Sequence, residues 1–228
     1  MRIAALYDIH GIVHALEAVL DELGPLGVDV IVVGGDVVAG PFPRETFDRL
    51  AALGDRCLYV RGNADREVVE SDEGQSRWCR EQLGTRIETM RGWPLTAIVD
   101  GVVFCHATLR SDDEIITRLT PEEAIIDAFG DTPLAIVGHT HVQFDRRVGN
   151  LRLVNAGSVG WPYEGTPGAR WALLDDGVTL RTTPYDVTAA AEAVRASAYP
   201  ESDEAAETLV APPSADEASE HFESRRGA

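Results

Sequence analysis

The sequence predicts an α/β fold in which two packed, mixed β-sheets are flanked by helices. In the first third of the 228-residue chain, short apolar runs alternate with segments of helical spacing. This alternation is typical of a parallel sheet whose faces are covered by helices. Further along, neighbouring apolar runs are joined by tight turns, which indicates antiparallel pairs. A largely parallel part followed by antiparallel pairs predicts two sheets packed together.

The first third of the chain is expected to supply three buried strands and three helices. Its apolar runs predict strands over residues 2–7, 29–36 and 57–63. Helical spacing predicts helices over residues 13–23, 44–53 and 66–83. We expect the first helix to end at Gly24-Pro25, because proline disrupts a helix interior.

The later strands are expected to pair through short turns. Asp100-Gly101 stands between two apolar runs in residues 96–106 and is a hairpin signal. Gly149-Asn150 and Asp176-Gly177 interrupt residues 143–155 and 171–181 in the same way. The apolar run 134–137 predicts a further buried strand.

From Asp186 onward the composition is acidic and rich in alanine. Composition alone allows a disordered tail. However, residues 186–199 have strong helix propensity, and Ser214 with Glu217 forms a capping-box sequence. We therefore expect helices that lie on the body of the protein or on a partner.

Charge and cysteine content limit the classes of function. The net charge is −18 and the pI about 4.6, so a long polyanion such as DNA or RNA is not an expected partner. A small anion could still be held by a local positive site such as a metal. The three cysteines show no CxxC spacing and predict reduced thiols in a cytoplasmic protein. The apolar start is too short for a secretory signal, and no run reaches the length of a membrane span.

Aspartate, asparagine and histidine residues follow five of the apolar runs. In an open α/β sheet, ligands bind beyond the carboxyl ends of the strands, so these side chains are expected to converge on one site. A single such residue is more often a helix cap or a loop polar group, but an ordered set of seven is not explained in that way. The seven residues are Asp8, His10, Asp36, Asn63, His106, His139 and His141.

The spacing of these residues favours two metal ions. Side chains at i and i+2 of an extended chain point to the same side, so Asp8 and His10 could hold one ion together. His139 and His141 would lie roughly 6.5–7 Å apart along a strand. That span suits one histidine on each of two ions about 3.5–4 Å apart. Asp36 could bridge the ions with its two oxygens, because the preceding glycines leave room for close approach.

The ordered set DIH…GD…GN…H…GHTH resembles the calcineurin-like metallophosphoesterases, and its spacing is closest to their small bacterial phosphodiesterase branch. The resemblance implies a four-layer αββα sandwich over residues 1–185, a metallophosphoesterase domain, with residues 186–228 as a C-terminal helical extension. It implies that Asp36 bridges two ions. The first ion would be bound by Asp8, His10 and His141, and the second by Asn63, His106 and His139. Mn is the metal expected first, with Fe, Zn or Ni as alternatives.

The expected activity is hydrolysis of small phosphodiesters by a metal-bridging hydroxide. The catalytic set would be Asp36, Asn63, His106 and Arg110. Arg110 could hold a phosphate oxygen, or it could be a surface arginine paired with Asp112 or Asp113. The alternatives are a phosphomonoesterase or protein phosphatase, a nucleotide pyrophosphatase, and a metal-stabilised interaction scaffold without activity. The expected partner is a small phosphoester, with no membrane involved and a homo-oligomer left open.

The sequence departs from the family pattern after Asn63. Many relatives carry a histidine there that protonates the leaving group, whereas this chain has Ala64. This departure weighs against the protein-phosphatase alternative. The next residue, Asp65, is expected to cap the helix that follows.

Overall fold

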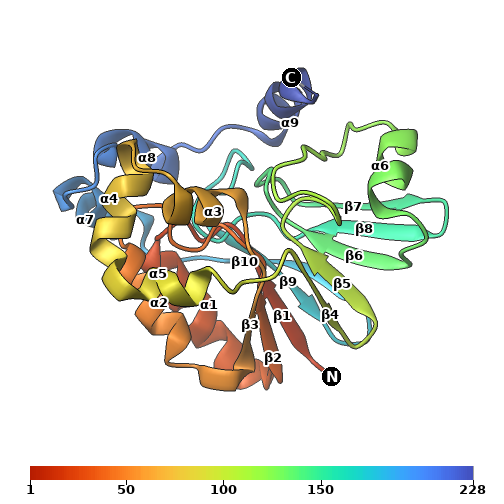
Figure 1. Ribbon diagram of the computed structural model, residues 1–228, viewed down its shortest axis with the longest axis horizontal. Coiled ribbons are helices and arrows are strands. Elements are labelled where there is room, and N and C mark those ends of the chain that lie inside the picture. The colour runs from red at the N-terminus through yellow and green to blue at the C-terminus, as the bar shows by residue number, and fades with distance from the viewer. Residues whose placement is uncertain (228) are drawn as a thin grey trace.

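Residues 1–227 of the computed structural model form two five-stranded mixed sheets packed face to face, with helices on both outer faces (Figure 1). The predicted four-layer αββα arrangement is confirmed. Within residues 1–227, no helix is long and apolar enough to cross a membrane.

The first sheet has the strand order β10-β9-β1-β2-β3. Its three N-terminal strands run parallel, and β9 and β10 are antiparallel additions at one edge. Successive residues of β1 alternate between two cores: Ala4 and Leu6 face the helices, whereas Ile3 and Ala5 face the second sheet. The strands are β1 (Ile3–Leu6), β2 (Val30–Val33), β3 (Cys57–Tyr59), β9 (Ala169–Leu174) and β10 (Val178–Thr183).

The second sheet has the order β4-β5-β6-β8-β7, with β6 parallel to β5 and β8. The β4–β5 hairpin turns at the predicted Asp100-Gly101, where φ is 52° and 78°. Positive φ at both turn residues is what a two-residue type I′ turn requires. The strands are β4 (Thr96–Val99), β5 (Val102–Cys105), β6 (Leu134–Val137), β7 (Phe144–Val148) and β8 (Leu151–Asn155).

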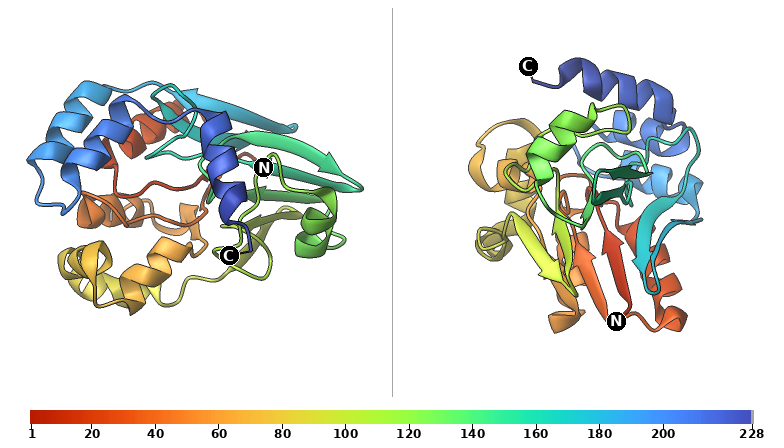
Figure 2. Two further views of the ribbon diagram at one scale, coloured as in Figure 1. Left: turned by 90° about the horizontal axis from the view of Figure 1, so that it is seen from above. Right: turned by 90° about the vertical axis from the view of Figure 1, so that its right-hand side faces the viewer.

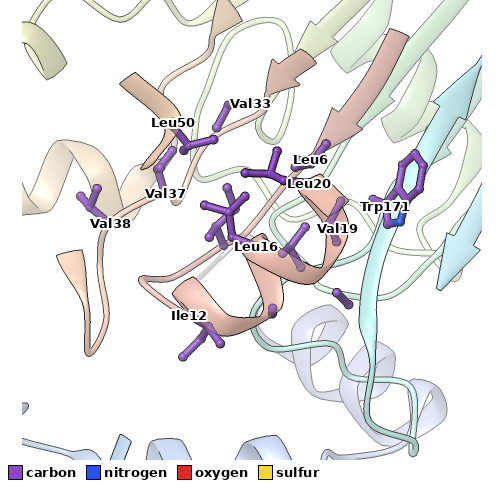
Figure 3. Packing of buried hydrophobic residues seen from close by; sticks show 14 of the residues in the cluster. Leu6, Ile12, Leu16, Val19, Leu20, Val33, Val37, Val38, Leu50 and Trp171 are labelled. Carbon is purple, nitrogen blue, oxygen red and sulfur yellow. The ribbon is translucent and has the colours of Figure 1, made fainter. Parts of the chain in front are cut away.

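Helices cover the outer face of the first sheet and bury its largest apolar cluster. Leu16, Val19 and Leu20 of α1 pack beside Leu6 and Trp171 (Figure 3). Full burial of each such side chain contributes about 1.5–3 kcal/mol. The helices before the second sheet are α1 (Val13–Leu26), α2 (Pro43–Ala51), α3 (Asn63–Glu70), α4 (Gly74–Leu83) and α5 (Ile87–Met90), with short 3₁₀ turns at Gly54–Arg56 and Gly84–Arg86. On the other outer face, α6 (Glu122–Phe129) buries Ile125 and Phe129.

Two predicted helix boundaries are wrong. The helix expected over residues 66–83 is two helices, α3 and α4, because the chain is extended at Ser71 and Glu73 between them. The first helix also continues through Pro25 to Leu26. It ends where Gly27 takes a left-handed conformation, since a glycine adopts this without steric cost.

The C-terminal residues form three helices, α7 (Val187–Ala196), α8 (Ser202–Val210) and α9 (Ala215–Arg225). The capping box predicted at Ser214 and Glu217 starts α9. The first two helices insert Ala190, Val194 and Leu209 into the cluster that α1 also fills. By contrast, α9 lies at the opposite end of the molecule from the N-terminus (Figure 1). The domain boundary that we place after residue 185 stays a prediction.

Removing residues 186–228 should therefore destabilise the protein far more than removing residues 214–228. The longer deletion uncovers the apolar cluster under α7 and α8, and we expect its melting temperature to fall by more than about 10 °C. The shorter deletion removes α9 alone and serves as the control. Thermal unfolding and sedimentation of both truncated proteins give the measurement, and equal melting temperatures would contradict this account of the packing.

Candidate metal centre

The seven predicted ligands converge at the carboxyl ends of the central strands of both sheets. Asp8 and His10 follow β1, Asp36 follows β2, and Asn63 is the first residue of α3 after β3. His106 follows β5, and the pair His139 and His141 follows β6. Because β1 runs parallel to β2, and β5 runs parallel to β6, the carboxyl ends of these strands lie at one edge of each sheet, where these side chains gather.

The side chains form two adjacent clusters. The ligand atoms of Asp8, His10 and His141 all lie within 4.8 Å of one another, and so do those of a second triad, Asp36, His106 and His139. Within the first triad, Nε2 of His141 lies 3.2 Å from Oδ1 of Asp8. Oδ1 of Asp8 also lies 3.8 Å from Nε2 of His106, so the two triads are in contact.

Backbone carbonyls set the orientation of three of the imidazole rings. Nδ1 of His10 lies 3.0 Å from the carbonyl oxygen of Ala39, and Nδ1 of His106 lies 2.9 Å from that of Gly34. Nδ1 of His141 lies 2.8 Å from the carbonyl oxygen of Trp161. A carbonyl only accepts, so each Nδ1 carries a hydrogen, and in the neutral ring each Nε2 presents a lone pair to the site.

These lone pairs face one another without donors between them. Nε2 of His10 and Nε2 of His141 are only 3.1 Å apart. Four buried ligand atoms lack a hydrogen-bond partner in residues 1–227: Asp8 Oδ1, Asn63 Oδ1, His106 Nε2 and His139 Nε2. Buried polar atoms are nearly always paired, and a divalent cation would pair these. The donor set of imidazole and carboxylate therefore fits a pair of metal ions.

Asp36 is the carboxylate that both clusters share. Its Oδ2 lies 3.6 Å from Nε2 of His10 and 3.4 Å from Nε2 of His106. Its Oδ1 accepts a hydrogen bond from the backbone N–H of Ala64 at 2.8 Å. Oδ2 therefore lies near one histidine of each triad, and the bridging of two ions by Asp36 stays a prediction.

The backbone at the ligands is not extended, which corrects the sequence argument from strand spacing. Within residues 1–227, six residues other than glycine have φ between 48° and 67°, and five of them are predicted ligands. These are Asp8, His10, Asp36, His139 and His141. A left-handed conformation costs a residue other than glycine about 1 kcal/mol or more, and such strain gathers at functional sites.

Glycines next to the ligands make the close packing feasible. A Cβ on Gly62 would lie 2.2 Å from Oδ1 of Asp36, and one on Gly138 would lie 2.4 Å from Oδ2 of Asp8. A Cβ on Gly35 would lie 2.6 Å from Nδ1 of His106. The glycines of the GD, GN and GH motifs therefore provide the space that the ligands occupy. Gly34 serves a different contact, since it makes room for the ring of Tyr7.

Two further residues near the centre have roles that the structure makes visible. Asp65 accepts hydrogen bonds from the backbone N–H groups of Val37 and Gly62, which confirms its role at the start of α3. Asn155 donates to the carbonyl of Gly138 and to Thr140, so it holds the loop that carries the paired histidines.

Arg110 lies outside both clusters. Its guanidinium binds Glu114 at 2.7 Å and Asp127 at 2.6 Å, and half of its side chain is exposed. The alternative pairing with Asp112 is wrong, because Asp112 binds Arg61 and Arg66 instead. The predicted contact between Arg110 and phosphate has no support in this geometry.

Three aromatic residues near the site were missed from the sequence. Trp161 stacks on His10 with ring centroids 4.7 Å apart, and Tyr163 lies 4.6 Å from the ring of His141. Phe222 of α9 lies 6.1 Å from the ring of His139. No spacing rule connects these residues to the ligands, although the sequence GWPYEG directly follows the glycine-rich NAGSVG segment.

A sequence profile of the calcineurin-like phosphoesterase superfamily domain matches residues 1–176. The chain belongs to this superfamily. It is similar to uncharacterized protein MJ0912 of Methanocaldococcus jannaschii, with 29% identity over 87% of this chain and 94% of that protein. It is also similar to phosphodiesterase YfcE of Escherichia coli, with 26% identity over 78% of this chain and 89% of that protein. A solved metallophosphoesterase from Sphaerobacter thermophilus superposes with a TM-score of 0.77 at 28% identity, over 92% of this chain and 98% of that one.

Membership of this superfamily makes the chain a hydrolase of phosphate esters. The superfamily generally uses divalent metal ions, and the two triads are candidate sites for them in this calcineurin-like phosphoesterase. The histidines must be neutral to bind a metal, so their protonation affects metal binding.

Two of the histidines differ in protonation when no metal is bound. Burial lowers the pKa of His139 to about 4, so this ring is neutral at neutral pH. Burial also opposes the charged form of His106, but the carboxylates of Asp36 and then Asp8 raise its pKa to about 10. Below that pH, His106 must lose a proton before its Nε2 can bind a metal, and metal affinity should rise with pH.

Metal uptake should therefore release about one proton per chain at pH 8. Titration calorimetry with Mn²⁺ in two buffers of different ionisation enthalpy measures the number of protons released. The His106→Asn variant is the control, because its amide carries no titrating proton, and it should release close to none. Equal proton release by the two proteins would show that the proton does not come from His106.

Proposed function

We propose that the chain hydrolyses small phosphodiesters with two divalent ions held by the seven converging residues. The observation that carries the proposal is the pair of adjacent buried triads, together with four buried ligand atoms that have no hydrogen-bond partner within residues 1–227. The similarity to a protein named as a phosphodiesterase supports the choice of diesters.

The residues divide between two ions with Asp36 shared. The first triad, Asp8, His10 and His141, would hold one ion. His106 and His139 would hold the other together with Asn63, whose unpaired Oδ1 lines the same cavity as His139. Nitrogen and oxygen donors suit Mn, Fe, Zn and Ni, and we propose Mn as the first metal to test. Bound there, the two ions supply Lewis-acid activation of water and of the phosphoryl group.

The contribution of the chain is to hold its ligands in one arrangement and to exclude water around them. The carbonyls of Ala39, Gly34 and Trp161 fix the tautomers of three rings, so each Nε2 stays available. The stack of Trp161 on His10 covers one side of the first triad. Preorganisation of this kind means that little rearrangement is needed when the substrate reacts.

Among the alternatives, the geometry favours a diesterase or nucleotide pyrophosphatase over a protein phosphatase. A cavity of about 710 Å³ adjoins the second triad and falls in the range of sites for small organic ligands. Carboxylates line this cavity, and Ala64 offers no proton for a poor leaving group. A pure scaffold would not need five strained ligands, whose cost is recovered only if they bind something.

Asp36→Asn should lower the turnover of a phosphodiester at least about 100-fold and weaken the binding of both ions, because a neutral amide is a poor shared ligand. Metal analysis and hydrolysis of bis(p-nitrophenyl) phosphate give the two measurements. Asp145→Asn is the matched control, since Asp145 lies on the edge strand β7, pairs with Arg152 and belongs to neither triad. Two tightly held ions with normal turnover in Asp36→Asn would remove Asp36 from the centre.

Because Ala64 stands where many relatives have a histidine, the rate of hydrolysis should depend strongly on the pKa of the leaving group. The backbone N–H of Ala64 binds Asp36, so the position directly adjoins the centre. A general acid contributes about 10²–10⁴-fold when the leaving group is poor, and alanine cannot donate a proton. We expect aryl diesters to react far faster than alkyl diesters, and Ala64→His to narrow the difference.

A series of phosphodiesters with graded leaving-group pKa measures this dependence in both proteins. His14→Gln is the control for another acid, because His14 packs against Phe42 and belongs to neither triad. A flat dependence in the unaltered protein would show that an acid is present. If the dependence then became steep in His14→Gln, that acid would be His14.

A further inference from the structure

The last helix forms part of the wall of the cavity beside the second triad. The cavity, about 710 Å³ in volume, is lined by Asn63 and His139 of the candidate metal centre and by Phe222, Arg225 and Arg226 near the end of the chain. Seen from above, α9 crosses between the helices on one side of the molecule and the second sheet on the other (Figure 2). A substrate that reaches the second triad through this cavity therefore meets α9.

Side-chain contacts fix α9 in this position. Glu223 accepts hydrogen bonds from the hydroxyls of Thr117 and Thr120. Arg118 binds Asp216 and donates to Ser219 one turn along the helix. These contacts hold several successive turns of α9 against the segment 117–120.

The same segment is joined to the ligand loop. Thr140, which stands between His139 and His141, donates to the carbonyl of Ile116 at 3.3 Å. Phe222 lies 6.1 Å from the ring of His139 and 6.4 Å from that of Tyr163. The position of α9 is therefore set relative to the metal ligands and not merely to the outer surface.

The charges on the cavity wall are divided between two sides. Glu67, Asp113 and Glu114 bring carboxylates, which repel an anionic substrate. Arg225 and Arg226 bring the positive charge, and both are at the end of α9. Arg226 binds Glu223 at 2.8 Å within its own helix. Arg225 lines the cavity without being the arginine that pairs with Glu223, so it is the guanidinium better placed for an anion in the cavity.

We propose that Arg225 binds a second anionic group of the substrate, and that Phe222 packs against the organic part between that group and the scissile phosphate. The substrate class that fits is a nucleotide-like phosphodiester that carries a further phosphate. A simple dialkyl phosphate would leave most of the 710 Å³ and the guanidinium unused. This inference rests on the proposed function and adds the substrate class to it.

Two probes that differ by one phosphate isolate the effect of the second charge. They are the p-nitrophenyl ester of thymidine 5′-phosphate and the same ester with a 3′-phosphate. Both release p-nitrophenolate, so any difference comes from the added group. With the Mn-loaded full-length protein, the 3′-phosphate should lower KM about tenfold, as expected for one charge-assisted contact.

Arg225→Gln should remove this preference, so that the two esters have KM values within about twofold. Arg195→Gln is the matched control, because Arg195 is also an exposed arginine near the end of a C-terminal helix but does not line this cavity. Glu223→Ala, which frees α9 from Thr117 and Thr120, should also reduce the preference through KM while both ions stay bound. An unchanged preference in Arg225→Gln, or no preference in the unaltered protein, would overturn the inference.

A binding measurement separates this inference from the proposed function. Calorimetry with thymidine 3′,5′-bisphosphate and thymidine 5′-phosphate needs no turnover. If neither ester is hydrolysed but the bisphosphate binds about tenfold more tightly in a manner that depends on Arg225, the proposed function fails and the inference about α9 holds. If both esters are hydrolysed without any dependence on Arg225, the inference fails and the proposed function holds.

Discussion

The structure depends on one electrostatic constraint: lone pairs and negative charges crowd together in a buried site. Oδ1 of Asp8 and Oδ2 of Asp36 lie within 4 Å of imidazole nitrogens that carry no hydrogen toward them when the rings are neutral. Burying a carboxylate without a compensating charge costs several kcal/mol. The site is therefore stabilised by uptake of protons or metal ions, and the raised pKa of His106 indicates that in the metal-free state its ring carries such a proton. Metal ions bound at the proposed centre would replace that proton.

The rest of the fold holds the ligands in this unfavourable arrangement. Five ligands are in left-handed backbone conformations, and neighbouring glycines remove the Cβ atoms that would block them. Such strain persists only where the surroundings are rigid. The surroundings here are three apolar clusters, one between the sheets and one under each helical layer. Strain at the strand ends is thus offset by burial along the strands, and each of the strained ligand motifs at Asp8, Asp36 and His139 follows a run of apolar residues.

The sequence was sufficient for the layers and for bringing six of the seven predicted residues into two adjacent triads, and insufficient for their local geometry. Local signals predicted their elements correctly. The alternation of apolar runs predicted the sheets, and the Asp100-Gly101 turn predicted the β4–β5 hairpin. The argument that His139 and His141 lie on an extended strand was wrong, because it assumed a regular backbone where the chain is strained. Arg110 was misjudged for another reason: sequence distance from His106 gave no information about Glu114 and Asp127, which bind it. The contacts of α9 with the loops before α6 and after β6 join segments far apart in the chain, and no periodicity reports them.

The acidic surface and the cationic site act on different length scales. With a net charge of −18, the protein repels anions as they approach, and this repulsion grows with the number of charges on the anion. At physiological ionic strength the field is screened beyond about 8 Å, so it opposes a long polyanion along its whole length but a small phosphoester only near the mouth of the cavity. Inside the cavity, Arg225 stands on a wall that also carries Glu67, Asp113 and Glu114, so ions bound at the proposed metal centre would be needed to make the local potential positive. Under the proposed function, cations bound at the buried centre and the arginines at the end of α9 would let an acidic protein accept a small, multiply charged substrate, whereas a long polyanion would meet repulsion along its whole length.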